Sequence, residues 1–172
     1  EEINKLTSLN FIACGTSWHA GKIAQFFFEN ISKIPTESHL ASELRYKTIF
    51  DSSNAIYMAI SQSGETADTL EAIRLINSRS MKTIALTNVA SSSLVRETQG
   101  FLLMQAGQEI AVASTKAFSA QVANLYWLAH FFAYEKGIIS FSEFEHCESE
   151  LLIAAEILES GIEKYKLEII QL

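Results

Sequence analysis

A run of hydroxyl and amide side chains stands where an expected strand passes into an expected helix. It reads Ser61-Gln62-Ser63-Gly64-Glu65-Thr66. The start of a helix presents unpaired backbone N–H groups and the positive end of the helix dipole, and hydroxyl and amide groups add further donors. Because the run contains no Lys or Arg, it predicts a phosphate-binding loop that works without a cation. The alternative is structural: Ser63 or Thr66 caps the helix while Gly64 eases the turn.

A second run, Cys14-Gly15-Thr16-Ser17, repeats this pattern near the N-terminus. It follows an apolar stretch of strand length at residues 9–13 and places two hydroxyls at the start of an expected helix. If the two strands are neighbours, Thr16 and Ser17 converge with the first run on one ligand. The alternative is again a helix cap, with Cys14 as a small core residue and not a nucleophile.

A third segment, residues 109–116, leads into a long apolar helix pattern. Ser114 and Thr115 are placed either to cap that helix or to meet sugar hydroxyls. Lys116 is the one cation in the three segments, and Glu109 is the one acid besides Glu65. A general base here is an open alternative, although a lysine beside a helix start is more often structural, for example paired with Glu109.

Composition and motif content exclude several classes of function. The net charge of -7 argues against nucleic acid or an anionic membrane as the main partner, because such surfaces need clustered Lys and Arg. No apolar stretch reaches the roughly 18 to 20 residues of a membrane span. Phosphate-loop and dinucleotide fingerprints are absent, and the four histidines have no metal-ligand spacing. We therefore expect no metal and no other cofactor. Cys14 and Cys147 permit one disulfide but no disulfide framework, which fits a reducing cytoplasm.

Apolar runs of strand length alternate with helical patterns along the chain. We expect strands at residues 9–13, 36–40, 55–60, 82–86 and 100–104, and helices at residues 18–32, 66–78, 114–136 and 142–172. Nearly continuous apolar runs are typical of strands buried on both faces of a parallel sheet. The alternation predicts right-handed βαβ units and hence an α/β protein, a three-layer α/β/α sandwich.

The end of the long helix suggests how the chain is divided. Gly137 is placed to stop that helix. The sequence therefore predicts a ligand-binding domain at residues 1–140 and an acidic, amphipathic helical linker at residues 141–172. Because the chain begins at Glu1 without a methionine and stops in an apolar helical stretch, we expect a fragment whose linker leads to further sequence.

Several motifs, in a consistent order, resemble the sugar isomerase (SIS) domain family, and within it the glutamine:fructose-6-phosphate aminotransferases. The similarity runs from about residue 11 to residue 130 and lies in Cys14-Gly15-Thr16-Ser17, residues 61–69, Asn88-Val89, residues 92–97 and residues 112–118. The resemblance implies a five-stranded parallel sheet between helices. It also implies a homodimer in which the neighbouring subunit lends a histidine to each site. The implied fructose 6-phosphate or glucose 6-phosphate site consists of Thr16, Ser17, Ser61, Gln62, Ser63, Thr66, Val112 and Ser114.

The resemblance further implies a division of labour. In this family a glutaminase part releases ammonia, and a second SIS half with a C-terminal tail supplies the isomerising glutamate and the ring-opening lysine. We therefore expect no catalytic residue in this chain, which would bind sugar phosphate for an enzyme that makes glucosamine 6-phosphate from fructose 6-phosphate and glutamine. Two alternatives stay open: a free-standing phosphosugar isomerase, and a SIS-type sensor domain that regulates a partner. Residues 112–118 favour the aminotransferase.

Overall fold

The computed structural model describes residues 3–49, 54–108 and 114–170. Its centre is a parallel five-stranded sheet in the order β2-β1-β3-β4-β5. The strands are β1 (Ser8–Ala13), β2 (Thr36–Leu40), β3 (Ala55–Ser61), β4 (Lys82–Thr87) and β5 (Gly100–Leu103). The chain runs from β1 to β2 at one edge, then returns past β1 to build β3, β4 and β5 toward the other. The strand order thus reverses between β1 and β3, and in open α/β sheets a ligand binds at the carboxyl ends of the strands at such a point.

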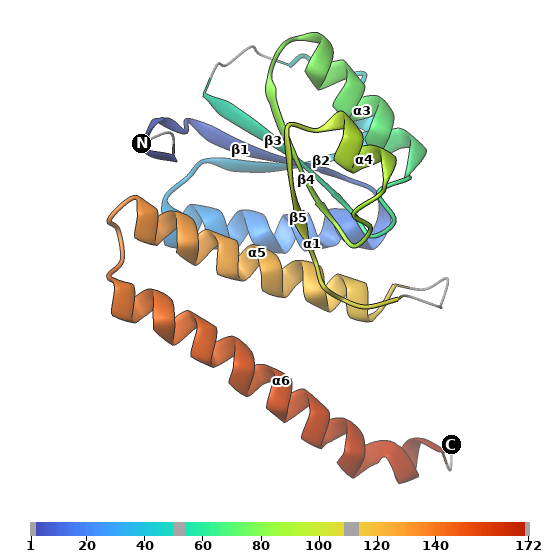
Figure 1. The fold of residues 1–172 in the computed structure, drawn as a ribbon, viewed down its shortest axis with the longest axis vertical. Coiled ribbons are helices and arrows are strands. Elements are labelled where there is room, and N and C mark those ends of the chain that lie inside the picture. The colour runs from blue at the N-terminus through green and yellow to red at the C-terminus, as the bar shows by residue number, and fades with distance from the viewer. Residues whose placement is uncertain (1–2, 50–53, 109–113, 171–172) are drawn as a thin grey trace.

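Helices cover both faces of the sheet, with α1 and α5 on one side and α2, α3 and α4 on the other (Figure 1). They are α1 (Gly15–Phe27), α2 (Ala41–Leu44), α3 (Ala67–Ser78), α4 (Ser93–Glu97), α5 (Lys116–Glu135) and α6 (Phe141–Ile170). A 3-10 turn at Ile3–Lys5 precedes β1, and a π-helical turn at Phe28–Ser32 follows α1. The predicted three-layer α/β/α sandwich is confirmed.

The core is split into two by the sheet. Leu9, Phe11 and Ala13 of β1 belong to the cluster beneath α1 and α5, whereas Ile12 belongs to the cluster beneath α2, α3 and α4. These four side chains are fully buried, and burying one large apolar side chain of this kind contributes about 1.5–3 kcal/mol. Central strands are buried on both faces, as their apolar runs predicted.

Strand β5 departs from that prediction. Phe101 is 48% exposed and Leu102 is 39% exposed. The strand pairs with β4 along one side and forms an edge of the sheet. The expectation that this apolar run is buried on both faces is therefore wrong, because an edge position is set by strand order and not by composition.

The first helix also differs from its prediction. It begins at Gly15, earlier than the expected Trp18, and its regular α-helical part ends at Phe27. The π-helical turn continues to Ser32, and Lys33 ends it in a left-handed conformation with φ 54°. The short helices α2 and α4 were not expected, because four or five residues carry too little periodicity to be recognised.

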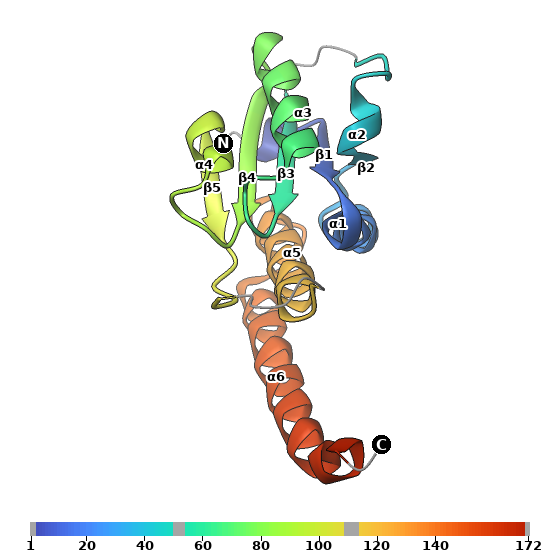
Figure 2. The ribbon, with the colours of Figure 1, turned by 90° about the vertical axis from the view of Figure 1, so that its right-hand side faces the viewer.

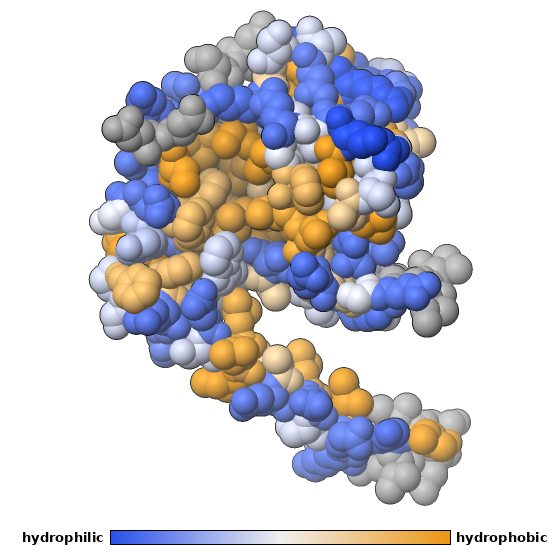
Figure 3. Space-filling view, viewed as in Figure 1, coloured by the Kyte–Doolittle hydropathy of each residue, from blue (hydrophilic) through white to orange (hydrophobic). Residues whose placement is uncertain are grey.

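Helix α6 projects away from the rest of the structure (Figure 2). Gly137, with φ 66°, follows the end of α5 as predicted. Near its start α6 buries Phe144 and Cys147, but farther along it exposes apolar side chains, among them Ile157 and Ile162 at 64% each. Figure 3 shows apolar surface along this helix. The proposed division between residues 140 and 141 stays a prediction. Among the described residues, no helix combines the length and apolar character that a bilayer crossing needs.

Candidate functional site

The loop after β3, residues 61–66, is organised by a buried hydroxyl. Ser61 Oγ accepts a hydrogen bond from the backbone N–H of Gly64 at 3.1 Å and lies 3.0 Å from Thr66 Oγ1. Thr66 occupies the N-cap position of α3, yet within the described residues its hydroxyl makes no capping bond to the helix. Ser63 Oγ accepts from the N–H of Glu65 at 3.2 Å, just before the helix. The cap interpretation is therefore wrong for Thr66, and the first N–H groups of α3 face the loop without a hydroxyl from Thr66.

Gly64 allows this loop to pack against the start of α4. Its φ of +66° lies in the left-handed region that favours glycine. A Cβ at this position would stand 2.5 Å from Ser92 Cβ and 2.9 Å from Thr87 Oγ1. The Gly64 carbonyl also accepts the backbone N–H of Leu94 at 3.1 Å. The position thus requires glycine for two independent reasons, conformation and space.

Glu65 fastens the same loop to α4. Its Oε1 accepts the backbone N–H of Ser93 at 2.7 Å. That bond lowers the pKa of Glu65 below its usual value, and a side-chain hydrogen bond with Ser93 and the charge of Arg96 lower it further. A carboxylate held in its ionised form in this way is a weak proton acceptor. Glu65 therefore anchors the loop to the start of α4.

The loop after β1, residues 14–17, is more open. Gly15 has φ +54°, and no described atom lies within 4 Å of the place a Cβ would take. Thr16 is exposed, whereas Ser17 is only 9% exposed. Ser17 Oγ accepts a hydrogen bond from Nε2 of the fully buried Gln121, on α5, at 2.9 Å. Among the described residues, this hydroxyl has Gln121 as its partner, so it accepts there and can still donate one hydrogen bond.

The strand order brings these two loops together. In the pairing of β1 with β3, Ala13 lies opposite Ile60, so the strands end side by side. Thr69 Oγ1 of α3 lies 4.0 Å from Cys14 Sγ, which joins the two loops behind this edge. Six of the predicted site residues therefore gather where the strand order reverses: Thr16, Ser17, Ser61, Gln62, Ser63 and Thr66.

The third predicted segment is described in part. Val112 and Glu109 lie outside the described residues. Thr115 takes the N-cap position of α5, but among the described residues its side chain makes no capping bond. Ser114 Oγ is buried and finds no hydrogen-bond partner in the described part of the chain. An unpaired buried hydroxyl is costly, so Ser114 is a candidate for contact with a ligand. The Lys116 ammonium donates to the backbone carbonyl of Gln108.

Asn88 was part of the family resemblance but not of the predicted site. Its backbone N–H donates to the carbonyl of Gln62 at 3.1 Å, and its Nδ2 donates to the carbonyl of Gly107 at 2.6 Å. Its Oδ1 accepts from the N–H of Ala106 at 3.0 Å. Asn88 thus connects the loop after β3 with the segment after β5, beside a cavity of about 340 Å³ that Gln62 and Asn88 help to line. Its position directly after an expected strand could have marked Asn88 as a site residue.

Comparisons with known proteins identify the family of the chain. The SIS domain family matches residues 2–131. Glutamine–fructose-6-phosphate aminotransferases are similar: the protein of Clostridium tetani is 42% identical over 163 residues, which are 95% of this chain and 27% of that protein. The protein of Acinetobacter baylyi is 48% identical over 130 residues, 72% of this chain and 21% of that protein. The chain thus spans about a quarter of the length of these relatives.

A solved structure extends the similarity to the fold. The C-terminal domain of glucosamine-fructose-6-phosphate aminotransferase from Francisella tularensis superposes with a TM-score of 0.89 at 36% identity, covering 99% of this chain and 48% of that one. The family match spans the whole sheet and both hydroxyl-rich loops. The chain therefore belongs to the SIS domain family.

Proposed function

We propose that this chain is the sugar-phosphate-binding half of the isomerase part of a glutamine:fructose-6-phosphate aminotransferase. The observation that carries the proposal is the meeting of the loops after β1 and β3 at the point where the strand order reverses. The similarity of 42% and 48% to aminotransferases of this kind supports the same assignment.

The phosphate of fructose 6-phosphate or glucose 6-phosphate would lie at the start of α3. There the backbone N–H groups of the first helical turn point at it, and the hydroxyls of Ser63 and Thr66 and the amide of Gln62 donate further hydrogen bonds. With no cation in residues 61–66, affinity comes from charge-assisted hydrogen bonds, each worth about 1.5–3 kcal/mol. Ser114 and Val112 would meet the sugar.

The chemistry of the whole enzyme would be carried by residues outside this chain. Within the proposed site Glu65 is held as a carboxylate by the start of α4, and we assign no proton transfer to it. The chain would therefore bind and orient the sugar phosphate without isomerising it. A homodimer, with a histidine from the neighbouring subunit at each site, and a cytoplasmic location belong to the same proposal.

The two alternatives within the fold family, a free-standing phosphosugar isomerase and a phosphosugar sensor, predict different neighbouring sequence. A glutaminase encoded before Glu1 would support the aminotransferase, and a basic helix-turn-helix module there would support the sensor. Reading the gene that encodes this chain distinguishes them.

Binding is tested directly by titrating fructose 6-phosphate and glucose 6-phosphate into the chain and following backbone amide shifts. We expect saturable changes at residues 61–66 and 14–17, weak affinity, and competition by inorganic phosphate. Purified chain should show no isomerase turnover. Absence of any shift at residues 61–66 with millimolar ligand would refute the site, and turnover that survives purification would refute the assignment of catalysis to other segments.

A further inference from the structure

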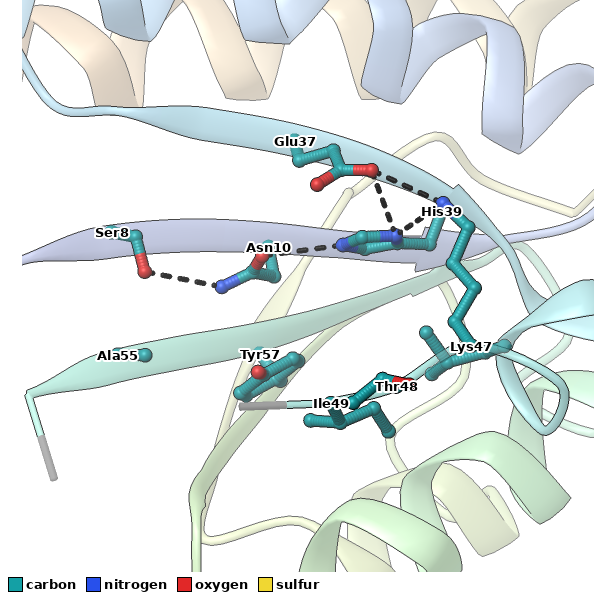
Figure 4. Close-up of a pocket in the computed structure, with 10 residues that line it drawn as sticks. Ser8, Asn10, Glu37, His39, Lys47, Thr48, Ile49, Ala55 and Tyr57 are labelled. Atoms are coloured by element: carbon teal, nitrogen blue, oxygen red, sulfur yellow. Dashed lines mark hydrogen bonds and ion pairs between the residues drawn. The ribbon is translucent and has the colours of Figure 1, made fainter. Parts of the chain in front are cut away.

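A second polar cavity lies away from the proposed sugar-phosphate site. It has a volume of about 320 Å³, which is at the lower end of the range for small-molecule sites. Its walls come from the first halves of β1 and β3, from Glu37 and His39 of β2, from Leu44 at the end of α2 and from the segment after it (Figure 4). Asn10 lies three residues before the end of β1, or roughly 10 Å along the strand. We call this second cavity the amino-end cavity. It opens on the side of the sheet covered by α2 and α3.

A chain of hydrogen bonds runs along one wall of this cavity. His39 is 7% exposed; its Nδ1 lies 3.2 Å from the Lys47 ammonium and its Nε2 lies 3.2 Å from Asn10 Oδ1. Asn10 Nδ2 in turn donates to Ser8 Oγ at 3.4 Å. Lys47 also donates to Glu37 Oε1 at 3.1 Å.

The amide oxygen of Asn10 sets the direction of its hydrogen bond with His39. Nδ1 of His39 also lies 3.3 Å from Glu37 Oε1, so it stands between a donor and an acceptor. The amide oxygen of Asn10 can only accept, so Nε2 of His39 carries a proton and donates it to Asn10. Burial lowers the pKa of His39, as do the charges of Lys47 and Lys22, while Glu37 acts in the opposite sense. A neutral ring with its proton on Nε2 fits both observations.

This direction leaves the wall with unused donors. Lys47 has three N–H groups and, within the described residues, gives two of them to Glu37 and His39. Against the described part of the chain, Asn10 keeps one N–H, and the Ser8 hydroxyl accepts from Asn10 and keeps its proton to donate. Buried apolar side chains of Leu44 and Ile49 and the ring of Tyr57 also line the cavity. Figure 4 shows Ile49 and Tyr57 below the polar row.

The local charge also favours an anion. The Glu37 carboxylate is paired with Lys47, and Lys22 is close enough to affect the pKa of both Glu37 and His39. With His39 neutral, the described charged groups besides Glu37 itself that act on Glu37 and His39 are the cations Lys47 and Lys22.

We propose that the amino-end cavity binds a small organic carboxylate with a short apolar body. The carboxylate oxygens accept hydrogen bonds from Lys47, Asn10 and Ser8. The apolar body lies against Leu44, Ile49 and Tyr57. The proposal does not depend on the sugar-phosphate site, because no residue is shared between them.

The probe for this proposal is 4-methylpentanoate, titrated into the 172-residue chain while backbone amide shifts are recorded. We expect saturable shifts at Ser8, Asn10 and Tyr57 with residues 61–66 unchanged. The uncharged analogue, 4-methylpentanamide, has nearly the same shape and should bind about threefold to fivefold more weakly, as expected for the loss of one half-exposed ion pair.

A pair of lysine variants completes the test. Lys47→Met should weaken 4-methylpentanoate about threefold to fivefold, whereas Lys136→Met, at the end of α5 on the other face of the sheet, should bind like the parent. The proposal is overturned if no saturable shift occurs at these residues, if the amide binds as well as the acid, or if both lysine variants bind alike. In those outcomes the row of polar side chains only packs the sheet face.

Discussion

The loops after β1 and after β3 have similar sequences but are held in different ways. Each has a glycine with positive φ, followed by hydroxyl side chains near a helix start. Gly64 is pressed against Ser92 and Thr87, while Gly15 faces open space. The loop after β3 is fixed by its own hydroxyls and by α4, whereas the loop after β1 is fixed by Gln121, from α5. Two loops with one sequence pattern can therefore differ greatly in their tolerance of change.

The largest expected difference is between two glycine substitutions. Gly64→Ala should abolish measurable sugar-phosphate binding and destabilise the chain by about 2–5 kcal/mol, the sum of about 1–2 kcal/mol for a left-handed alanine and about 1–3 kcal/mol for overpacking. Gly15→Ala should destabilise the chain by only the first contribution, the about 1–2 kcal/mol of a left-handed alanine. Urea unfolding and ligand titration of both variants measure the two effects. Equal destabilisation would show that the contact with Ser92 does not matter.

Hydroxyl removal tests whether the Thr66 hydroxyl binds phosphate or only holds the loop through Ser61. Thr66→Ala should weaken sugar-phosphate binding about tenfold, because one charge-assisted hydrogen bond contributes about 1.4 kcal/mol or more. Thr66→Ser keeps a hydroxyl and should retain most of the affinity. Ser78→Ala, which removes a hydroxyl at the far end of α3, is the matched control. Calorimetric titration well below the melting temperature compares them; parental affinity in Thr66→Ala would move the phosphate site elsewhere.

A smaller effect should follow when the support of the loop after β1 is removed. Gln121→Leu deletes the hydrogen bond to Ser17 Oγ and should weaken binding about fivefold, since one neutral hydrogen bond contributes about 1 kcal/mol. Ser17→Ala and the double variant complete a double-mutant cycle. Affinity losses that simply add would mean that Gln121 does not act through Ser17.

The smallest effect concerns Glu65 and pH. Its pKa is lowered in the folded state by the N–H of Ser93, so the ionised form contributes stability above the unfolded-state pKa of about 4.3, and this contribution is lost as pH falls through the lower folded-state pKa. Glu65→Gln should therefore melt below the parent at neutral pH, with the gap closing below about pH 4. Melting curves across this range, with exposed Glu29→Gln as control, measure it. A constant gap would mean that the charge of Glu65 is irrelevant.

Much of the fold follows from local pattern. The five strands and the longer helices lie close to their predicted positions, because buried strands and amphipathic helices each leave a periodicity of their own in the sequence. Helices α2 and α4 are too short to leave one. The exposure of Phe101 in β5 could not be predicted from the sequence either, because an edge strand and a central strand can have the same composition.

The residues of the candidate site could be predicted from the sequence, but the distant residues that hold them in place could not. Hydroxyls next to glycine after an apolar run mark Ser61 and Thr16 as residues at strand ends. Nothing in those runs shows that Glu65 is bound by Ser93, 28 residues later, or that Ser17 meets Gln121 across 104 residues. The role of His39 was missed for the same reason, because its partner Asn10 lies on the neighbouring strand, 29 residues earlier.

The sequence by itself determined which segments form strands and helices and which loops are rich in hydrogen-bond donors, since these depend on neighbours a few residues apart. The tertiary structure alone decided which loops meet. Strand order places β3 beside β1 and sends β2 to the edge, and that order depends on how whole helices pack on the two faces. The convergence of Ser17 and Ser61 at one edge, and the polar row from Lys47 to Ser8, are consequences of packing between residues that are distant in the chain.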